Sequence, residues 1–139
     1  MRRDWTRGRR VPAIACAVLV LAGAGALRAH HSHGNYTDTF TDVEGTVKAV
    51  HLINPHSWIY LDVKNAEGQI QTWALEATSV AGLQRSGVTR ETLKPGDPIK
   101  VRCHPLRDGS RGCLLGFVKT KDGKITDWDG TNLPLPRDL

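Results

Sequence analysis

Alternation of apolar and polar positions dominates the chain after residue 42 and predicts β-strands. Residues 43–49 alternate in this way, and residues 57–63 do so again. In the second segment one face is aliphatic and the other carries aromatic and acidic groups: Ile59, Leu61 and Val63 against Trp58, Tyr60 and Asp62. Further strands are expected at 70–76, 99–103 and 113–120, separated by turn-forming residues.

Between the third and fourth strands, Thr78 or Ser79 can cap a short helix that Gly87 terminates. Three strands, a helix and two strands follow the order of a five-stranded OB-type barrel. We therefore expect an all-β fold with a small α contribution, a flat α+β sheet being the alternative. The shared core is predicted to contain Val47, Ile59, Leu61, Val63, Val101 and Phe117.

The first 29 residues have the three-part layout of an export signal. Five arginines lie within the first ten positions, an apolar run extends from Val11 to Leu27, and small-residue cleavage sites lie at its end. We divide the chain into a signal peptide (1–29), a histidine-rich arm (30–41), a barrel domain (42–125) and a C-terminal tail (126–139). This layout predicts a periplasmic or secreted protein, with no later apolar stretch near the ~20 residues that span a bilayer.

Charge gives no reason to expect nucleic acid as a partner once the signal is set aside. Six of the 19 basic side chains and one of the 14 acidic ones lie in residues 1–29, so the remaining 110 residues carry 13 of each. The basic character of the whole chain therefore comes from the signal rather than from a binding surface.

Several short motifs occur in a fixed order: His30-His31-Ser32, Asn54-Pro55-His56, Trp73 with Glu76, Leu93-Lys94-Pro95-Gly96-Asp97 and Arg107-Asp108-Gly109-Ser110. With this ordered set, the chain over residues 30–124 resembles a bacterial family of small exported proteins, domain-of-unknown-function family 6152. The resemblance implies export and a β-rich fold but no activity. The chain departs from the family pattern by an inserted His33 and by Cys103 and Cys113.

The candidate metal ligands are His30, His31, His33, His56 and Glu76. Signal removal can leave a histidine at or near a free α-amine, and amines and imidazoles suit Cu(II), while zinc also accepts imidazole. Cleavage after the Ala24-Gly25-Ala26 segment would instead leave three residues before the cluster. Glu76 ends the third strand, so it is expected near His56 at the start of the second. The alternatives are a mobile polar arm, a turn histidine and a helix-capping carboxylate.

An alternative function uses aromatic side chains. Trp58, Tyr60 and Trp73 are predicted to line a groove that binds a small ligand or a partner by stacking, although packing beneath the arm or the tail gives the same pattern.

Cys103 and Cys113 flank the Arg107-Asp108-Gly109 turn of a predicted hairpin. Disulfides persist in the oxidising compartments that exported proteins enter, so these two cysteines form a candidate disulfide, the alternative being two free thiols. The chain contains no Gly-x-Ser-x-Gly, no His-Glu-x-x-His and no phosphate loop. We therefore expect a binding protein rather than an enzyme, with a copper enzyme as a third possibility.

Overall fold

The computed structural model of the protein describes residues 33–139. In chain order, this part contains a 3-10 turn η1 (His33–Asn35), β1 (Thr41–His51), β2 (Ser57–Lys64), β3 (Ile70–Ala77), helix α2 (Val80–Arg85), β4 (Pro98–Pro105), β5 (Gly112–Thr120) and β6 (Ile125–Asp127). Ser79 caps α2 by accepting a hydrogen bond from the Gly82 amide. The expected helix between the third and fourth strands is therefore confirmed.

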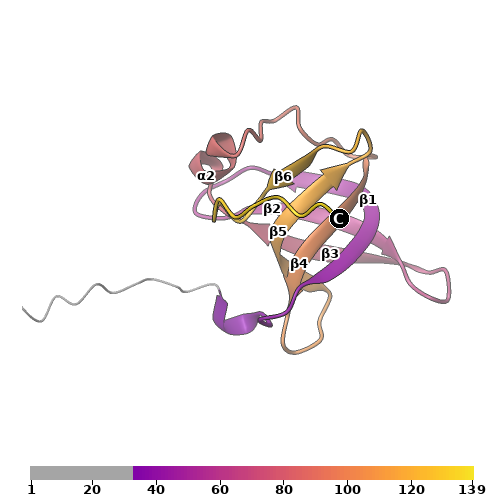
Figure 1. Ribbon diagram of the computed structural model, residues 1–139. Coiled ribbons are helices and arrows are strands. Elements are labelled where there is room, and N and C mark those ends of the chain that lie inside the picture. The colour runs from indigo at the N-terminus through magenta and orange to yellow at the C-terminus, as the bar shows by residue number, and fades with distance from the viewer. Residues whose placement is uncertain (1–32) are drawn as a thin grey trace, which may run out of the picture. The chain divides into compact units, whose positions relative to one another are not determined.

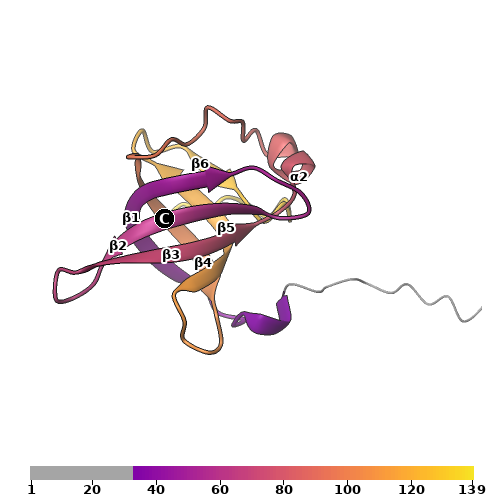
Figure 2. The same ribbon diagram turned by 180° about the vertical axis from the view of Figure 1, so that it is seen from behind.

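The strands form one sheet that closes on itself. Neighbouring strands follow the order β3-β2-β1-β4-β5-β6 and pair antiparallel, and a parallel pairing of β3 with β5 closes a five-stranded barrel. Figures 1 and 2 show this barrel from its two sides, with the β2–β3 hairpin loop projecting beyond it. The predicted all-β barrel is confirmed, and β6 adds a short strand at the free edge of β5.

The barrel core matches the aliphatic faces of the predicted strands, with one correction. Val47, Ile59, Leu61 and Val101 belong to it, and Val63 packs against it. Phe117 is buried but lies opposite Arg102 on the outer face, because a register shift on β5 places both Leu115 and Val118 inside. Strict alternation from Leu115 wrongly assigned Phe117 to the core, since such a bulge reverses the faces of a strand.

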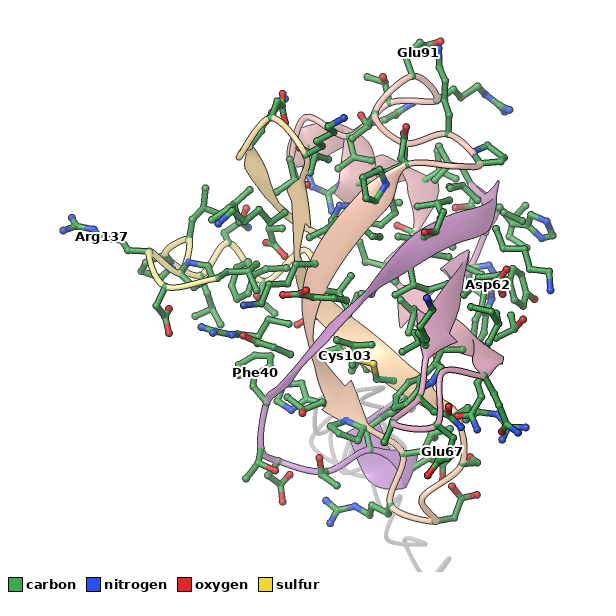
Figure 3. All side chains as sticks on the ribbon, turned by 90° about the vertical axis from the view of Figure 1, so that its right-hand side faces the viewer. Phe40, Asp62, Glu67, Glu91, Cys103 and Arg137 are labelled. Atoms are coloured by element: carbon green, nitrogen blue, oxygen red, sulfur yellow. A yellow bond between two sulfur atoms is a disulfide. The ribbon has the colours of Figure 1, made fainter. Side chains whose placement is uncertain are left out.

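Cys103 and Cys113 form a disulfide, which confirms the prediction. Their Cα atoms lie 5.8 Å apart on β4 and β5, and both side chains are fully buried. The turn sets them diagonally, with Cys103 opposite Leu115 and Cys113 opposite Pro105. Figure 3 shows the sulfur-sulfur bond beside the Cys103 label, inside the barrel.

Both ends of the described chain pack on the barrel. Before β1, the Thr37 amide donates to the Pro105 carbonyl, and the Arg107 amide donates to the Asn35 carbonyl. In the segment expected as a C-terminal tail, Trp128 is 1% exposed and belongs to the core.

Within residues 33–139, no helix is long and apolar enough to cross a membrane.

Candidate functional site

The pairing of β2 with β3 brings two predicted site residues to the same end of the hairpin. Trp58, the second residue of β2, lies opposite Glu76, the next-to-last residue of β3. His56 precedes β2 directly, so its side chain and the Glu76 carboxylate meet. The sequence analysis predicted that these two groups lie near each other, because the two strands of a hairpin are antiparallel neighbours.

The loop that carries His56 is fixed by the backbone on both sides of it. The buried Ser57 amide donates to the Thr78 carbonyl, and the Ser57 hydroxyl donates to the Ile53 carbonyl. Asn54, which precedes Pro55 in a cis peptide bond, accepts a hydrogen bond from the Val80 amide at the start of α2. These contacts hold His56 at a defined place beside β3.

Glu76 is the centre of a small polar cluster, which we call the Glu76 cluster and define as Tyr36, His56 and Glu76. The residue is only 8% exposed. Its Oε1 lies 2.5 Å from His56 Nδ1, and its Oε2 accepts a hydrogen bond of 2.6 Å from the Tyr36 hydroxyl. Both carboxylate oxygens are therefore engaged, as a buried carboxylate requires.

His56 faces the carboxylate with one ring nitrogen and leaves the other available. Its Nδ1 is the atom that contacts Glu76, while 43% of the His56 side chain is exposed. A carboxylate on one side of an imidazole favours the tautomer protonated at that nitrogen, and Nε2 is then left with a free lone pair. The arrangement can bind a metal ion or accept a proton at Nε2.

Tyr36 is the member of the cluster that the sequence analysis missed. It is 6% exposed and pairs with Leu106 through an isolated β-bridge. Burial and the hydrogen bond to Glu76 raise the pKa of the Tyr36 hydroxyl well above its usual range. Its partner is 40 residues away in sequence, so no local pattern indicates the contact.

The remaining candidate ligands lie at or beyond the edge of the described chain. His30 and His31 fall outside the described residues. The backbone of His33 begins η1, three residues before Tyr36, but its side chain falls outside the description. Within residues 33–139, no three His, Cys, Asp or Glu side chains are grouped as a metal site requires.

The three aromatic residues predicted to line one groove do not share a face. Trp58 and Tyr60 remain on the outer face of β2, where the His51 ring contacts Tyr60 edge-on at a centroid distance of 5.3 Å. Trp73 lies opposite Leu61 and packs against the core. The sequence pattern already indicated that Trp73 faces the core. Trp73 is two residues from the core residue Leu75, and side chains two apart in a strand share a face.

Comparison with known protein families confirms the family resemblance. The chain matches a family of unknown function, DUF6152, over residues 17–116. No curated protein matches it. The protein belongs to the DUF6152 family.

Proposed function

We propose that the protein is exported and binds a transition metal, with copper as the preferred ion and zinc as the alternative. The observation that carries this proposal is the docking of the arm. Tyr36 hydrogen-bonds to Glu76, the same carboxylate that contacts His56. The histidine run therefore precedes an anchor that lies one side chain away from an exposed imidazole.

Chain length limits how far the arm histidines can be from that imidazole. An extended chain spans at most about 3.6 Å per residue, so the Cα of His33 lies within about 11 Å of the Tyr36 Cα. Side chains of this reach can meet a metal ion bound at His56. The sequence motif contributes His30 and, after suitable cleavage, an α-amine.

Glu76 acts in this proposal by orienting His56 rather than as the ligand that the sequence suggested. Both of its oxygens already contact protein groups. Metal-binding histidines commonly donate their second ring nitrogen to a carboxylate, which fixes the tautomer and raises the basicity of the ligating nitrogen. His56 would then bind the metal through Nε2.

The donor set favours copper. Imidazole nitrogens with a free amine or an amide suit the square-planar geometry of Cu(II), whereas zinc prefers tetrahedral sites. The described residues supply one imidazole with its orienting carboxylate, so the arm must supply the other ligands. Ligand nitrogens must be deprotonated to bind, and affinity should fall as pH drops through the histidine range near ~6.5.

The test is calorimetric titration of the exported protein with Cu(II) and Zn(II), after its N-terminus has been determined by mass spectrometry. We expect the His30→Ala/His31→Ala variant to lose tight Cu(II) binding. Replacing His56 by Gln should weaken binding, and His51→Gln is the matched control because His51 is also an exposed histidine on the barrel.

Glu76→Gln is the most specific variant. Glutamine can still accept from Tyr36, but its amide group donates towards His56 and favours the tautomer protonated at Nε2. We expect weaker metal binding with a nearly unchanged fold. Equal Cu(II) affinity in the wild type, His56→Gln and Glu76→Gln would show that the arm acts alone. No binding at all would favour the aromatic surface of Trp58 and Tyr60 as the functional site.

A further inference from the structure

A surface depression lies at the other end of the β2–β3 hairpin, where the pairing of β1 with β2 ends. The pairing of these strands begins at Thr46 and Asp62; earlier residues of β1 pair with β4, and later residues of β2 pair with β3. The depression at this place has a volume of about 770 Å³ and is wide open to solvent. We call it the hairpin hollow; it is lined by residues of β1–β5 and the following turn, among them Gly45, Asp62, Lys64, Ile70, Lys100 and Lys121.

Gly45 is required where β1 passes closely over β2, just before the two strands begin to pair. A Cβ at this position would lie 2.5 Å from the Asp62 carbonyl oxygen and 2.9 Å from the Leu61 side chain. The backbone of β1 can therefore pass close to β2 only without a side chain. Lys64 and Ile70, which line the hollow, flank the β2–β3 loop that projects from the barrel in Figures 1 and 2.

The walls of the hairpin hollow carry an excess of positive charge. Four lysines and two carboxylates line it: Lys64, Lys100, Lys119 and Lys121 against Glu44 and Asp62. The carboxylates already have cationic partners, because Lys48 lies 3.6 Å from Asp62 and Lys100 lies 3.8 Å from Glu44. Lys119 donates to the backbone oxygen of Leu139.

Lys64 and Lys121 are the cations that remain available. Within residues 33–139, neither ammonium group takes part in a salt bridge or a side-chain hydrogen bond, and both side chains are exposed. Beside Lys64 lies an apolar surface, since Ile70 is directly opposite it in the hairpin and is 60% exposed. Figure 3 shows Asp62 and Glu67, which mark this hairpin, on one side of the barrel.

We propose that the hairpin hollow binds a single-chain amphiphile with one anionic head group, of the fatty-acid type. The free ammonium groups of Lys64 and Lys121 complement the head group, and the Ile70 surface with Pro98 contacts the apolar chain. A lysine attracts an anion as a point charge without demanding a planar partner, so a carboxylate is sufficient. This site goes beyond the proposed metal function and uses none of its residues.

The experiment is a calorimetric titration with decanoate below its micelle concentration, in the presence of EDTA so that metal binding makes no contribution. We expect saturable binding of one decanoate, with weaker binding of 1-decanol and none of decyltrimethylammonium. The Lys64→Gln/Lys121→Gln variant should weaken decanoate binding by roughly tenfold. Ile70→Ser should also weaken it, while Lys94→Gln, at an exposed loop lysine outside the hollow, should not.

Unchanged decanoate affinity in the double lysine variant would overturn the proposal. So would binding to vesicles of anionic phospholipid without binding to monomeric decanoate, since that result indicates a membrane surface instead. All the substituted side chains are exposed, and a far-ultraviolet spectrum and a urea midpoint equal to those of the wild type confirm that each variant is folded.

Discussion

The two ends of the β2–β3 hairpin hold charged groups in opposite settings. At one end, Glu76 is 8% exposed, and both of its oxygens contact protein groups from distant parts of the chain. At the other end, six residues earlier in β3, Ile70 and its partner Lys64 are exposed at an open hollow. Burial makes an unpartnered carboxylate costly, so the first end must be fully satisfied, whereas solvent allows lysines at the second end to remain free.

This difference determines what kind of ligand each proposed site would favour. The Glu76 cluster is built by tertiary contacts, since Tyr36 reaches it from the arm and His56 from the loop before β2. Protein contacts therefore orient His56, as the proposed metal site requires. The hairpin hollow offers long flexible cations and an apolar wall, which suit a ligand that is recognised by charge and area.

Among the changes considered, loss of the disulfide should lower the free energy of unfolding most. Cys113 lies opposite Leu75 in the β3–β5 pairing, next to the pair of Glu76 with Leu114. Closing a loop of this length stabilises the fold by about 2–3 kcal/mol, so Cys103→Ala/Cys113→Ala should lower the free energy of unfolding by at least that amount. Urea denaturation measures it.

Hydrogen exchange of the same variant tests which end depends on the disulfide. We expect protection to fall more at the amides of residues 74–76 than at those of residues 62–64. An equal fall at both ends would contradict the dependence of the Glu76 cluster on the β3–β5 closure.

Glu76→Ala should lower the free energy of unfolding by about 2 kcal/mol, because the buried Tyr36 hydroxyl loses its acceptor. Glu44→Ala, at a lysine-paired carboxylate whose side chain is 74% exposed, is the matched control and should change it by less than about 0.5 kcal/mol. Urea unfolding at neutral pH measures both. Similar decreases in the free energy of unfolding for the two variants would mean that burial does not make the Glu76 carboxylate more important for stability than an exposed one.

Tyr36→Phe should cost about 1.5 kcal/mol at neutral pH, because one oxygen of the buried Glu76 carboxylate loses its hydrogen-bond donor. Its pH dependence is more informative. The folded pKa of Tyr36 is raised above the unfolded value near ~10, so its contribution is fully present below that pH and is lost as pH rises towards the folded pKa. The stability of the wild type should therefore fall more steeply above pH ~10 than that of Tyr36→Phe.

Chemical denaturation at a series of alkaline pH values tests this prediction. Parallel stability curves for the wild type and Tyr36→Phe would show that the hydroxyl is not held in its neutral form by the fold. The Tyr60→Phe variant is the control: Tyr60 lies on the same face of the β2–β3 hairpin as Glu76, but among the described residues the hydroxyl that donates to Glu76 is that of Tyr36.

The lysines of the hairpin hollow should have the smallest effect on stability. Lys64→Gln/Lys121→Gln removes two exposed charges without side-chain partners, so the free energy of unfolding should change by less than about 0.5 kcal/mol. Thermal denaturation measures the shift. A loss as large as that of Glu76→Ala would show that these lysines hold the barrel together.

Much of this architecture is local enough to be predicted from the sequence. The strand alternation identified the barrel strands, and the segment between Thr78 and Gly87 predicted α2. The turn between Cys103 and Cys113 predicted the disulfide, and the hairpin connection predicted that His56 and Glu76 are neighbours. Each of these depends on residues close in sequence or on a single strand pairing.

Only the tertiary structure decided the rest. The register shift that turns Phe117 outward depends on how β5 pairs with β4, because one residue of slip exchanges the two faces of a strand. The contact of Tyr36 with Glu76 requires the arm to pack on the β4–β5 connection beside β3, and the hairpin hollow requires β1 to pair with β4 where it no longer pairs with β2. These features arise from packing between distant segments, whose relative positions no local pattern specifies.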